Sequence, residues 1–131
     1  MKFEHLIQSG DFRGEKHVPV IEAPETVKAG ETFTVQVSVG KEIAHPNTTE
    51  HHIRWIKLYF KPAEGKFPYE VFNVEFNVHG ESVAGPNQGP AYAEPVASAA
   101  VRIDRPGTLV AASYCNIHGL WESFREIGLE A

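Results

Sequence analysis

The feature that most constrains the fold is a series of short stretches in which apolar and polar residues alternate, each bounded by proline or glycine. The clearest stretch is 32–39, whose apolar face carries Phe33, Val35, Val37 and Val39. Strict alternation is typical of a β-strand, because successive side chains point to opposite faces. No segment has the pattern of a long helix, and the nine prolines and eleven glycines are spread along the chain rather than clustered. The sequence therefore predicts many short strands.

The other predicted strands follow the same rule. They are residues 17–23, a short strand near Val27, and residues 52–61, 69–79, 96–103 and 108–115. Residues 104–107 contain Pro106 followed by Gly107, which predicts a tight turn that joins 96–103 and 108–115 as a hairpin. Residues 120–131 fit either an edge strand or a helical turn. About seven strands separated by turns predict an all-β fold, an immunoglobulin-like antiparallel β-sandwich.

Two segments carry additional expectations. In residues 52–61, Ile56, Leu58 and Phe60 share one face, while the other face carries Ile53, Trp55 and Tyr59. Because both faces are apolar, we expect this strand to be covered on both sides. Residues 80–95 hold three glycines and three prolines and predict a long, ordered surface loop.

Length and charge limit the class of protein. With 131 residues, we expect 1–131 to form a single domain. Lys and Arg total 12 against 17 Asp and Glu, a net charge of −5, which predicts no nucleic-acid partner. Residues 1–12 lack the apolar segment of a signal peptide, and no run approaches the ~20 apolar residues of a membrane helix. We therefore expect a cytoplasmic protein with no membrane partner.

Seven histidines and a single cysteine point to a metal site. One cysteine excludes an intrachain disulfide and any zinc site that needs two cysteines. Five candidate ligands lie in or beside loops that flank predicted strands: His17, His45, His51, Cys115 and His118. Cys115 and His118 form a Cys-x-x-His pair, whose spacing lets both side chains reach one ion. We expect the remaining histidines not to be ligands: His5, His52 and His79.

The donor set narrows the choice of metal. Structural zinc prefers four ligands, and magnesium and calcium prefer oxygen. A blue-copper electron-transfer site uses two histidines, one cysteine and a weak axial methionine, but the only methionine is Met1. Iron with four imidazoles in a plane and an axial thiolate would use all five residues and leave one position open. A blue-copper-like protein and a metal-free immunoglobulin-like interaction module remain the alternatives.

Three segments together resemble one family. They are Glu-Lys-His-Val-Pro at 15–19, His-Pro-Asn-Thr-Thr-Glu-His-His-Ile at 45–53, and Ser-Tyr-Cys-Asn-Ile-His-Gly-Leu-Trp at 113–121. They occur in the order found in superoxide reductases of the one-iron neelaredoxin class, which are related to the C-terminal domain of desulfoferrodoxin. Two-iron relatives carry an N-terminal rubredoxin-like domain whose iron is held by four cysteines. A single cysteine cannot form that centre, so we expect no such domain in residues 1–131.

The resemblance implies a role for each candidate residue. It implies one iron ion (Fe2+/Fe3+) per chain, with Cys115 as the axial ligand and four equatorial histidines: His17, His45, His51 and His118. Glu15 is similar to the family glutamate that occupies the sixth position of the ferric form. Lys16 corresponds to the lysine beside the open position, so Glu15 and Lys16 are the candidate catalytic residues. The backbone amides of Asn116 and Ile117 are expected to donate hydrogen bonds to the sulfur.

The resemblance also implies an activity. Members of this family are oxidoreductases that detoxify superoxide under oxidative stress by its one-electron reduction to hydrogen peroxide at a non-haem iron. The implied electron donor is rubredoxin or a similar small electron-transfer protein, and the implied assembly is a homotetramer. Superoxide is an anion and the chain is acidic, so Lys16 is expected to attract it locally. Superoxide dismutation remains an alternative reaction.

Overall fold

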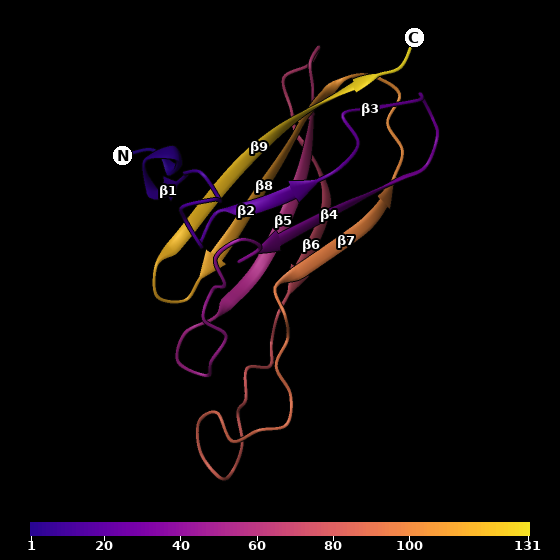
Figure 1. Cartoon of the computed structure of the whole chain (residues 1–131). Helices are drawn as coiled ribbons and strands as arrows, with labels where there is room; N and C mark the ends of the chain where they lie inside the picture. The colour runs from indigo at the N-terminus through magenta and orange to yellow at the C-terminus, as the bar shows by residue number, and fades with distance from the viewer.

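The alternating segments form two β-sheets that pack face to face in the computed structural model, which describes residues 1–131 (Figure 1). The chain begins with a short 3-10 helix and continues through nine strands: η1 (Phe3–Leu6), β1 (Ile7–Gln8), β2 (Pro19–Glu22), β3 (Thr26–Val27), β4 (Phe33–Val39), β5 (Ile53–Pro62), β6 (Tyr69–Glu75), β7 (Val96–Val101), β8 (Gly107–Cys115) and β9 (Gly119–Leu129). No helix is long or apolar enough to cross a membrane.

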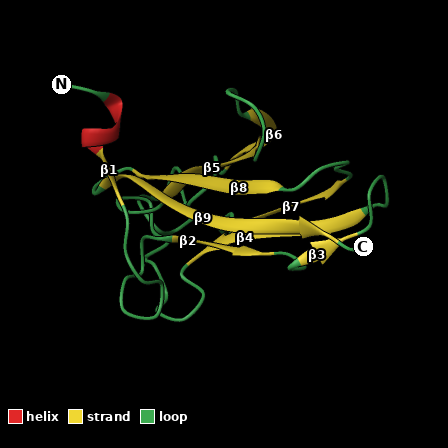
Figure 2. Ribbon diagram, turned by 90° about the horizontal axis from the view of Figure 1, so that it is seen from above, coloured by secondary structure: helices red, strands yellow, loops and turns green.

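The larger sheet has six strands in the order β1-β9-β8-β5-β6, with β3 also pairing with β9, and the smaller sheet has the order β2-β4-β7. The long strands pair antiparallel, whereas β1 and β3 pair parallel with β9. Seen from above, the two sheets form separate layers (Figure 2). The predicted antiparallel β-sandwich is confirmed. The count rises from about seven strands to nine because the two-residue strand β1 and the C-terminal strand β9 also belong to the larger sheet.

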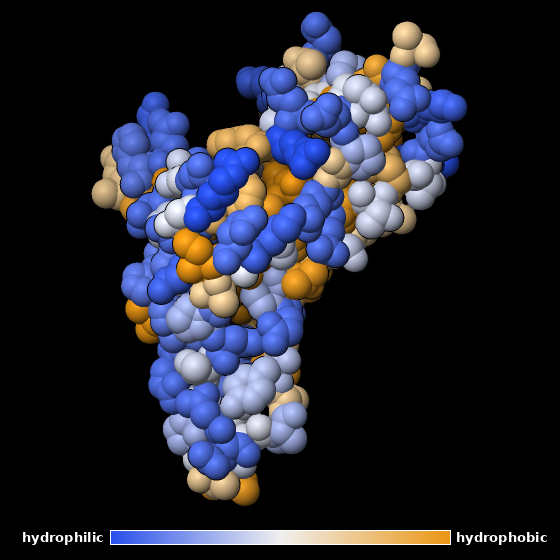
Figure 3. Space-filling model, in the orientation of Figure 1, coloured by the Kyte–Doolittle hydropathy of each residue, from blue (hydrophilic) through white to orange (hydrophobic).

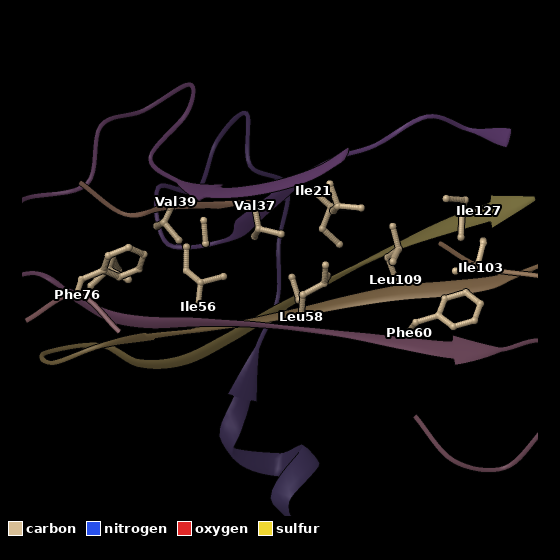
Figure 4. Packing of buried hydrophobic residues seen from close by; sticks show 14 of the residues in the cluster. Ile21, Val37, Val39, Ile56, Leu58, Phe60, Phe76, Ile103, Leu109 and Ile127 are labelled. Atoms are coloured by element: carbon tan, nitrogen blue, oxygen red, sulfur yellow. The ribbon is translucent and has the colours of Figure 1, made fainter. Parts of the chain in front are cut away.

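The core lies between the inner faces of the two sheets (Figure 4). Val35 and Val37 of β4 are fully buried, as the alternation predicted, and Ile56 and Leu58 of β5 are fully buried in the opposite sheet. Sixteen buried residues form one apolar cluster. Removing these side chains from water is the main favourable contribution to folding, and it fixes which face of each strand points inward.

The predicted hairpin at residues 104–107 is wrong. β7 pairs with β4 in the smaller sheet, whereas β8 pairs with β5 and β9 in the larger one. The segment between them therefore crosses from one sheet to the other, and Ile103 is buried in the core at this crossing. Turn residues determine where the chain changes direction, but the burial of both flanking strands determines which strands pair.

Two further expectations need correction. Ile53 does not share a face with Trp55, because the β5–β8 pairing shifts register between these residues, and Ile53 joins the core with 3% of its surface exposed. Residues 69–79 do not form one strand: β6 ends at Glu75, and His79 only forms an isolated bridge with Tyr92. The ambiguous segment 120–131 proves to be a strand. As β9 it lies between β8 and β1, and not at an edge.

The fold brings distant segments to one end of the sandwich. His17 lies just before β2, residues 40–52 join β4 to β5, and residues 116–118 join β8 to β9. These connections lie near one another at the lower end of Figure 1. The connection between β6 and β7 extends beyond the sheets at the same end, and its surface is mostly hydrophilic in Figure 3. It contacts the β4–β5 connection through Thr49, whose hydroxyl donates a hydrogen bond to the carbonyl of His79 at 2.6 Å.

Candidate metal centre

Four of the predicted ligands converge at this end. One ligand atom from each of His17, His45, His51 and Cys115 lies within 4.8 Å of all the others. An ion bound at about 2.0–2.3 Å by nitrogen and sulfur separates opposite ligand atoms by roughly 4–4.5 Å. The spacing of these four atoms therefore suits a single ion, and we call the group, together with His118, the metal-site cluster.

His118 lies against the same group from the turn between β8 and β9. Its Nδ1 is 3.1 Å from Nε2 of His17 and 3.9 Å from Sγ of Cys115, and its ring centroid is 5.0 Å from that of His51. The next residue, Gly119, has φ +80°, a left-handed conformation that side chains disfavour. This glycine allows a tight turn directly after the four residues from Cys115 to His118.

His45 and His51 present free nitrogens to the cluster. The Nε2 atoms of both are buried without a hydrogen-bond partner, and buried polar atoms are seldom left unpaired. Nδ1 of His45 donates to the carbonyl of Pro46 at 2.7 Å, which leaves Nε2 as the lone-pair nitrogen. Burial lowers the pKa of His45 to about 4 and also lowers the pKa of His51. Both rings are neutral near pH 7, as a metal ligand must be.

Cys115 is the last residue of β8, and 0% of its surface is exposed. Its sulfur accepts a hydrogen bond from the backbone N–H of His118 at 3.4 Å. The expectation that the amides of Asn116 and Ile117 donate to this sulfur is wrong: the N–H of Asn116 donates to the carbonyl of His52 at 3.2 Å, and the N–H of Ile117 makes no hydrogen bond to the sulfur. The sulfur accepts from the backbone N–H of His118, two residues after Asn116, because the turn directs that amide back toward the sulfur.

Asn116 joins the two loops that carry most of the cluster. Its side-chain amide donates to the carbonyl of Glu50 at 2.9 Å, and its side-chain oxygen accepts from the backbone N–H of His52, also at 2.9 Å. These bonds hold the Cys115 turn against the segment that presents His51. Asn116 is part of the motif at 113–121, but the spacing of that motif did not indicate that Asn116 joins the two loops.

Gly40 is a second residue that sequence reasoning missed. It follows β4 with φ +90°, and a Cβ at this position would lie 2.7 Å from the backbone nitrogen of His45. Any side chain here would push the loop away from the strand. The only signal in the sequence is a glycine directly after the clearest predicted strand.

Trp121 is a third. It is 7% exposed, and its ring stacks on that of His17 with centroids 4.8 Å apart and planes at 13°. Its indole N–H donates to the carbonyl of His118 at 3.2 Å. One side chain thus supports two members of the cluster, by packing on one and bonding the backbone of the other.

Glu15 and Lys16 lie beside the cluster. Oε1 of Glu15 accepts a hydrogen bond from the backbone N–H of His17 at 3.0 Å and lies 2.6 Å from Nδ1 of the same residue. The side-chain bond to His17 lowers the pKa of Glu15 below 4.5. Lys16 is half-buried. Burial is the main cause of the low pKa of His51, and the positive charge of Lys16 is one of the smaller causes.

The histidines predicted to be non-ligands lie outside the cluster. His5 is exposed in η1. His52 and His79 stack on each other with centroids 3.5 Å apart and planes at 5°, and we call them the stacked pair. Nδ1 of His52 donates to the carbonyl of Thr48 at 2.9 Å, and its Nε2 accepts from Arg54 at 3.3 Å.

Known proteins are similar to this chain in sequence and in fold. Residues 9–124 match the Desulfoferrodoxin family, so the chain belongs to the desulfoferrodoxin family. It is 55% identical to a neelaredoxin of Megalodesulfovibrio gigas, covering 99% of this chain and 100% of that one. It is also 57% identical to a superoxide reductase of Pyrococcus furiosus, covering 95% and 96% of the two chains.

Solved structures agree with this assignment. The crystal structure of a Thermotoga maritima protein, 58% identical, superposes with a TM-score of 0.97 over 100% of this chain and 99% of that chain. The reduced form of a superoxide reductase (neelaredoxin) from Archaeoglobus fulgidus is 53% identical, with a TM-score of 0.88 over 95% of this chain and 99% of that chain. A chain of this family that gathers imidazoles and a cysteine sulfur has the donors that transition metals prefer, not the oxygen donors of magnesium or calcium.

Proposed function

We propose that this protein is a superoxide reductase, an oxidoreductase that converts superoxide to hydrogen peroxide. The observation that carries the proposal is the convergence of His17, His45, His51 and Cys115 within 4.8 Å, in a chain whose relatives include a superoxide reductase at 57% identity. We assign the metal as one mononuclear iron per chain. Its proposed ligands are the five members of the cluster: His17, His45, His51, Cys115 and His118.

The residues of the cluster set the properties of such a site. Neutral imidazoles add no charge, and a single thiolate leaves a divalent ion with a net positive charge that favours an anion. The N–H of His118 draws electron density from the sulfur and so moderates its donation. When bound, iron supplies the one electron that, with two protons, turns superoxide into hydrogen peroxide.

Lys16 is the proposed residue for attracting the substrate. The chain carries a net charge of −5, so its overall field repels an anion and any attraction must be local. Lys16 follows Glu15 directly and is half-buried, and its charge contributes to the lowered pKa of His51. Its ammonium group can also hold a water molecule that gives a proton to the product.

Glu15 is proposed as the carboxylate that would supply an oxygen to the sixth position of bound iron, as the family resemblance implies. In the structure its Oε1 is bonded to His17. For this role, that oxygen would have to leave His17.

Four broader features are also proposed. Residues 1–131 would form a single iron-binding domain, without a rubredoxin-like domain, since one cysteine cannot supply a four-cysteine centre. The electron donor would be rubredoxin or a similar small protein, the assembly a homotetramer, and the location the cytoplasm.

The stoichiometry of the reaction tests the proposal. We expect iron-loaded protein with excess reduced donor to form one hydrogen peroxide for each superoxide consumed, with no oxygen released. Dismutation would instead release one oxygen and one peroxide for every two superoxide ions. Oxygen release at that ratio in the presence of donor would contradict the proposal.

The copper alternative is not favoured by the structure. A blue-copper site needs a weak axial ligand such as methionine, and the only methionine, Met1, is 98% exposed. Metal analysis of protein purified without added metal distinguishes the two sites. One iron per chain supports the proposal, and one copper per chain contradicts it.

A further inference from the structure

His17 differs from the other members of the cluster in how its ring is held. Its Nδ1 lies 2.6 Å from Oε1 of Glu15, and its Nε2 lies 3.1 Å from Nδ1 of His118. The two nitrogens are on opposite sides of the imidazole. The carboxylate is therefore behind the ring, and the other nitrogen faces the cluster.

The chemistry of the two groups fixes the proton. An ionised carboxylate only accepts hydrogen bonds, and a neutral imidazole carries one N–H, so the N–H must be at Nδ1. The lone pair is then at Nε2, which faces the cluster. For a histidine, the hydrogen bond made by one ring nitrogen decides which nitrogen remains free for a metal.

We propose that Glu15 is a positioning residue for His17, which holds the ring in the Nδ1–H tautomer and directs Nε2 toward the metal. This role rests on the proposed function only in taking His17 as a ligand. It is distinct from the sixth-position role, because an oxygen bonded to Nδ1 is on the wrong side of the ring to reach an ion held by Nε2.

Two other contacts support this role. Oε1 of Glu15 also accepts from the backbone N–H of His17, so the carboxylate is anchored independently of the ring. Trp121 stacks on the ring at 13° and restricts it to one plane, so the carboxylate only has to fix the orientation within that plane. The carbonyl of Pro46 makes the equivalent bond to Nδ1 of His45 at 2.7 Å. Carboxylates and carbonyls behind metal-bound histidines are a common arrangement.

The tautomer can be measured directly in the metal-free protein. We would record 15N spectra of the histidine side chains at mildly alkaline pH for the wild type, Glu15→Ala, Glu15→Gln and a control, Glu42→Ala. Glu42 is an exposed carboxylate three residues before His45. We expect His17 to be Nδ1–H in the wild type, in the control and in Glu15→Gln, whose amide oxygen still accepts. Glu15→Ala should show a mixture of both tautomers. An unchanged tautomer in Glu15→Ala, or an Nε2–H wild type, would overturn the inference.

Zinc affinity gives the second measurement, by competition of Zn2+ with a chromophoric chelator for the same four proteins. Removing a hydrogen-bond partner behind a metal ligand typically costs about 10–100-fold in affinity. We expect a loss of that size in Glu15→Ala, a smaller loss in Glu15→Gln, and wild-type affinity in Glu42→Ala. Equal affinity of Glu15→Ala and wild type would overturn the inference. Neither measurement involves superoxide, so a protein that behaves as expected here but fails to reduce superoxide contradicts only the proposed function.

Discussion

The metal-site cluster and the stacked pair show two ways of burying histidines in one small domain. In the cluster the ring of His45 meets both neighbours nearly edge to face, His17 at 76° and His51 at 82°, while His17 and His51 are inclined by 28° with centroids 6.5 Å apart. In the stacked pair, His52 and His79 lie flat on each other at 5°. The lone pair of an imidazole lies in the plane of its ring. Steeply inclined rings can direct their lone pairs at one centre, whereas the lone pairs of stacked rings lie in separate parallel planes.

Burial alone therefore does not identify a ligand. The Nε2 of His79 is buried and unpaired, as are those of His45 and His51. What distinguishes the cluster is that its free nitrogens converge with a thiol. His51 and His52 are neighbours in the sequence, yet they belong to different groups because they enter β5, where successive side chains point to opposite sides.

The largest predicted effect is that of Cys115→Ser. We expect the iron-loaded variant to lose the sulfur-to-iron charge-transfer absorption. Its activity should fall at least ~100-fold, because removing even a hydrogen-bond partner behind a metal ligand can cost that much. Serine is close in size, so the buried position should tolerate it. The visible spectrum of iron-loaded protein makes the measurement, and a spectrum identical to the wild type would remove Cys115 from the site.

The next effect separates the two histidine groups. His45→Ala or His51→Ala should lower iron occupancy or change the spectrum, because each deletes a converging nitrogen. His79→Ala should keep one iron per chain, while losing about 1–3 kcal/mol of stability through the buried space it leaves. Iron content and thermal unfolding of the three variants provide the data. Loss of iron from His79→Ala, with retention in His51→Ala, would mean that the wrong group was assigned.

Lys16→Ala should have a smaller effect, on rate and not on metal content. We expect its reaction with superoxide to be about tenfold slower at low ionic strength, the equivalent of ~1.4 kcal/mol, and less dependent on salt. The control is Lys28→Ala, an exposed lysine that directly follows β3. β3 lies at the opposite end of the sheets from the turn between β8 and β9 (Figure 1). Pulse radiolysis at two salt concentrations measures both. A Lys16→Ala rate equal to the wild type at low salt would show that this lysine does not attract the substrate.

The smallest effect is expected for Asn116→Ala. The variant loses two hydrogen bonds of 2.9 Å between the ligand-bearing loops, which predicts a loss of about 1–2 kcal/mol in the free energy of unfolding of the metal-free protein. Denaturant titration checks it. Unfolding at the wild-type denaturant concentration would mean that other contacts hold the two loops together.

Much of the fold followed from local pattern. Alternation placed Val35 and Val37 in the core. The loops and strand ends placed the candidate ligands in or beside connections, where four of them converge and His118 lies against them. The crossing after β7 did not follow, because turn residues do not specify the partner of the next strand. The position of Ile53 depends on a register shift, and alternation counts residues without detecting such shifts.

The support of the site was less predictable than its ligands. Imidazole and thiol groups are rare enough for their spacing to be informative. The roles of Gly40, Trp121 and Asn116 depend on contacts between segments far apart in the chain, and nothing in their spacing indicates them. The bond between Glu15 and His17 joins residues two apart, but it depends on a side-chain conformation that sequence does not specify.

The position of the iron tests the central claim most directly. A crystal of iron-loaded protein, measured on both sides of the iron absorption edge, gives an anomalous difference map that locates the ion without assumptions about its ligands. The arrangement of the two histidine groups predicts one peak per chain, bonded to Sγ of Cys115 and to ring nitrogens of His17, His45, His51 and His118. A peak beside His52 and His79, or a peak that contacts no sulfur, would contradict it.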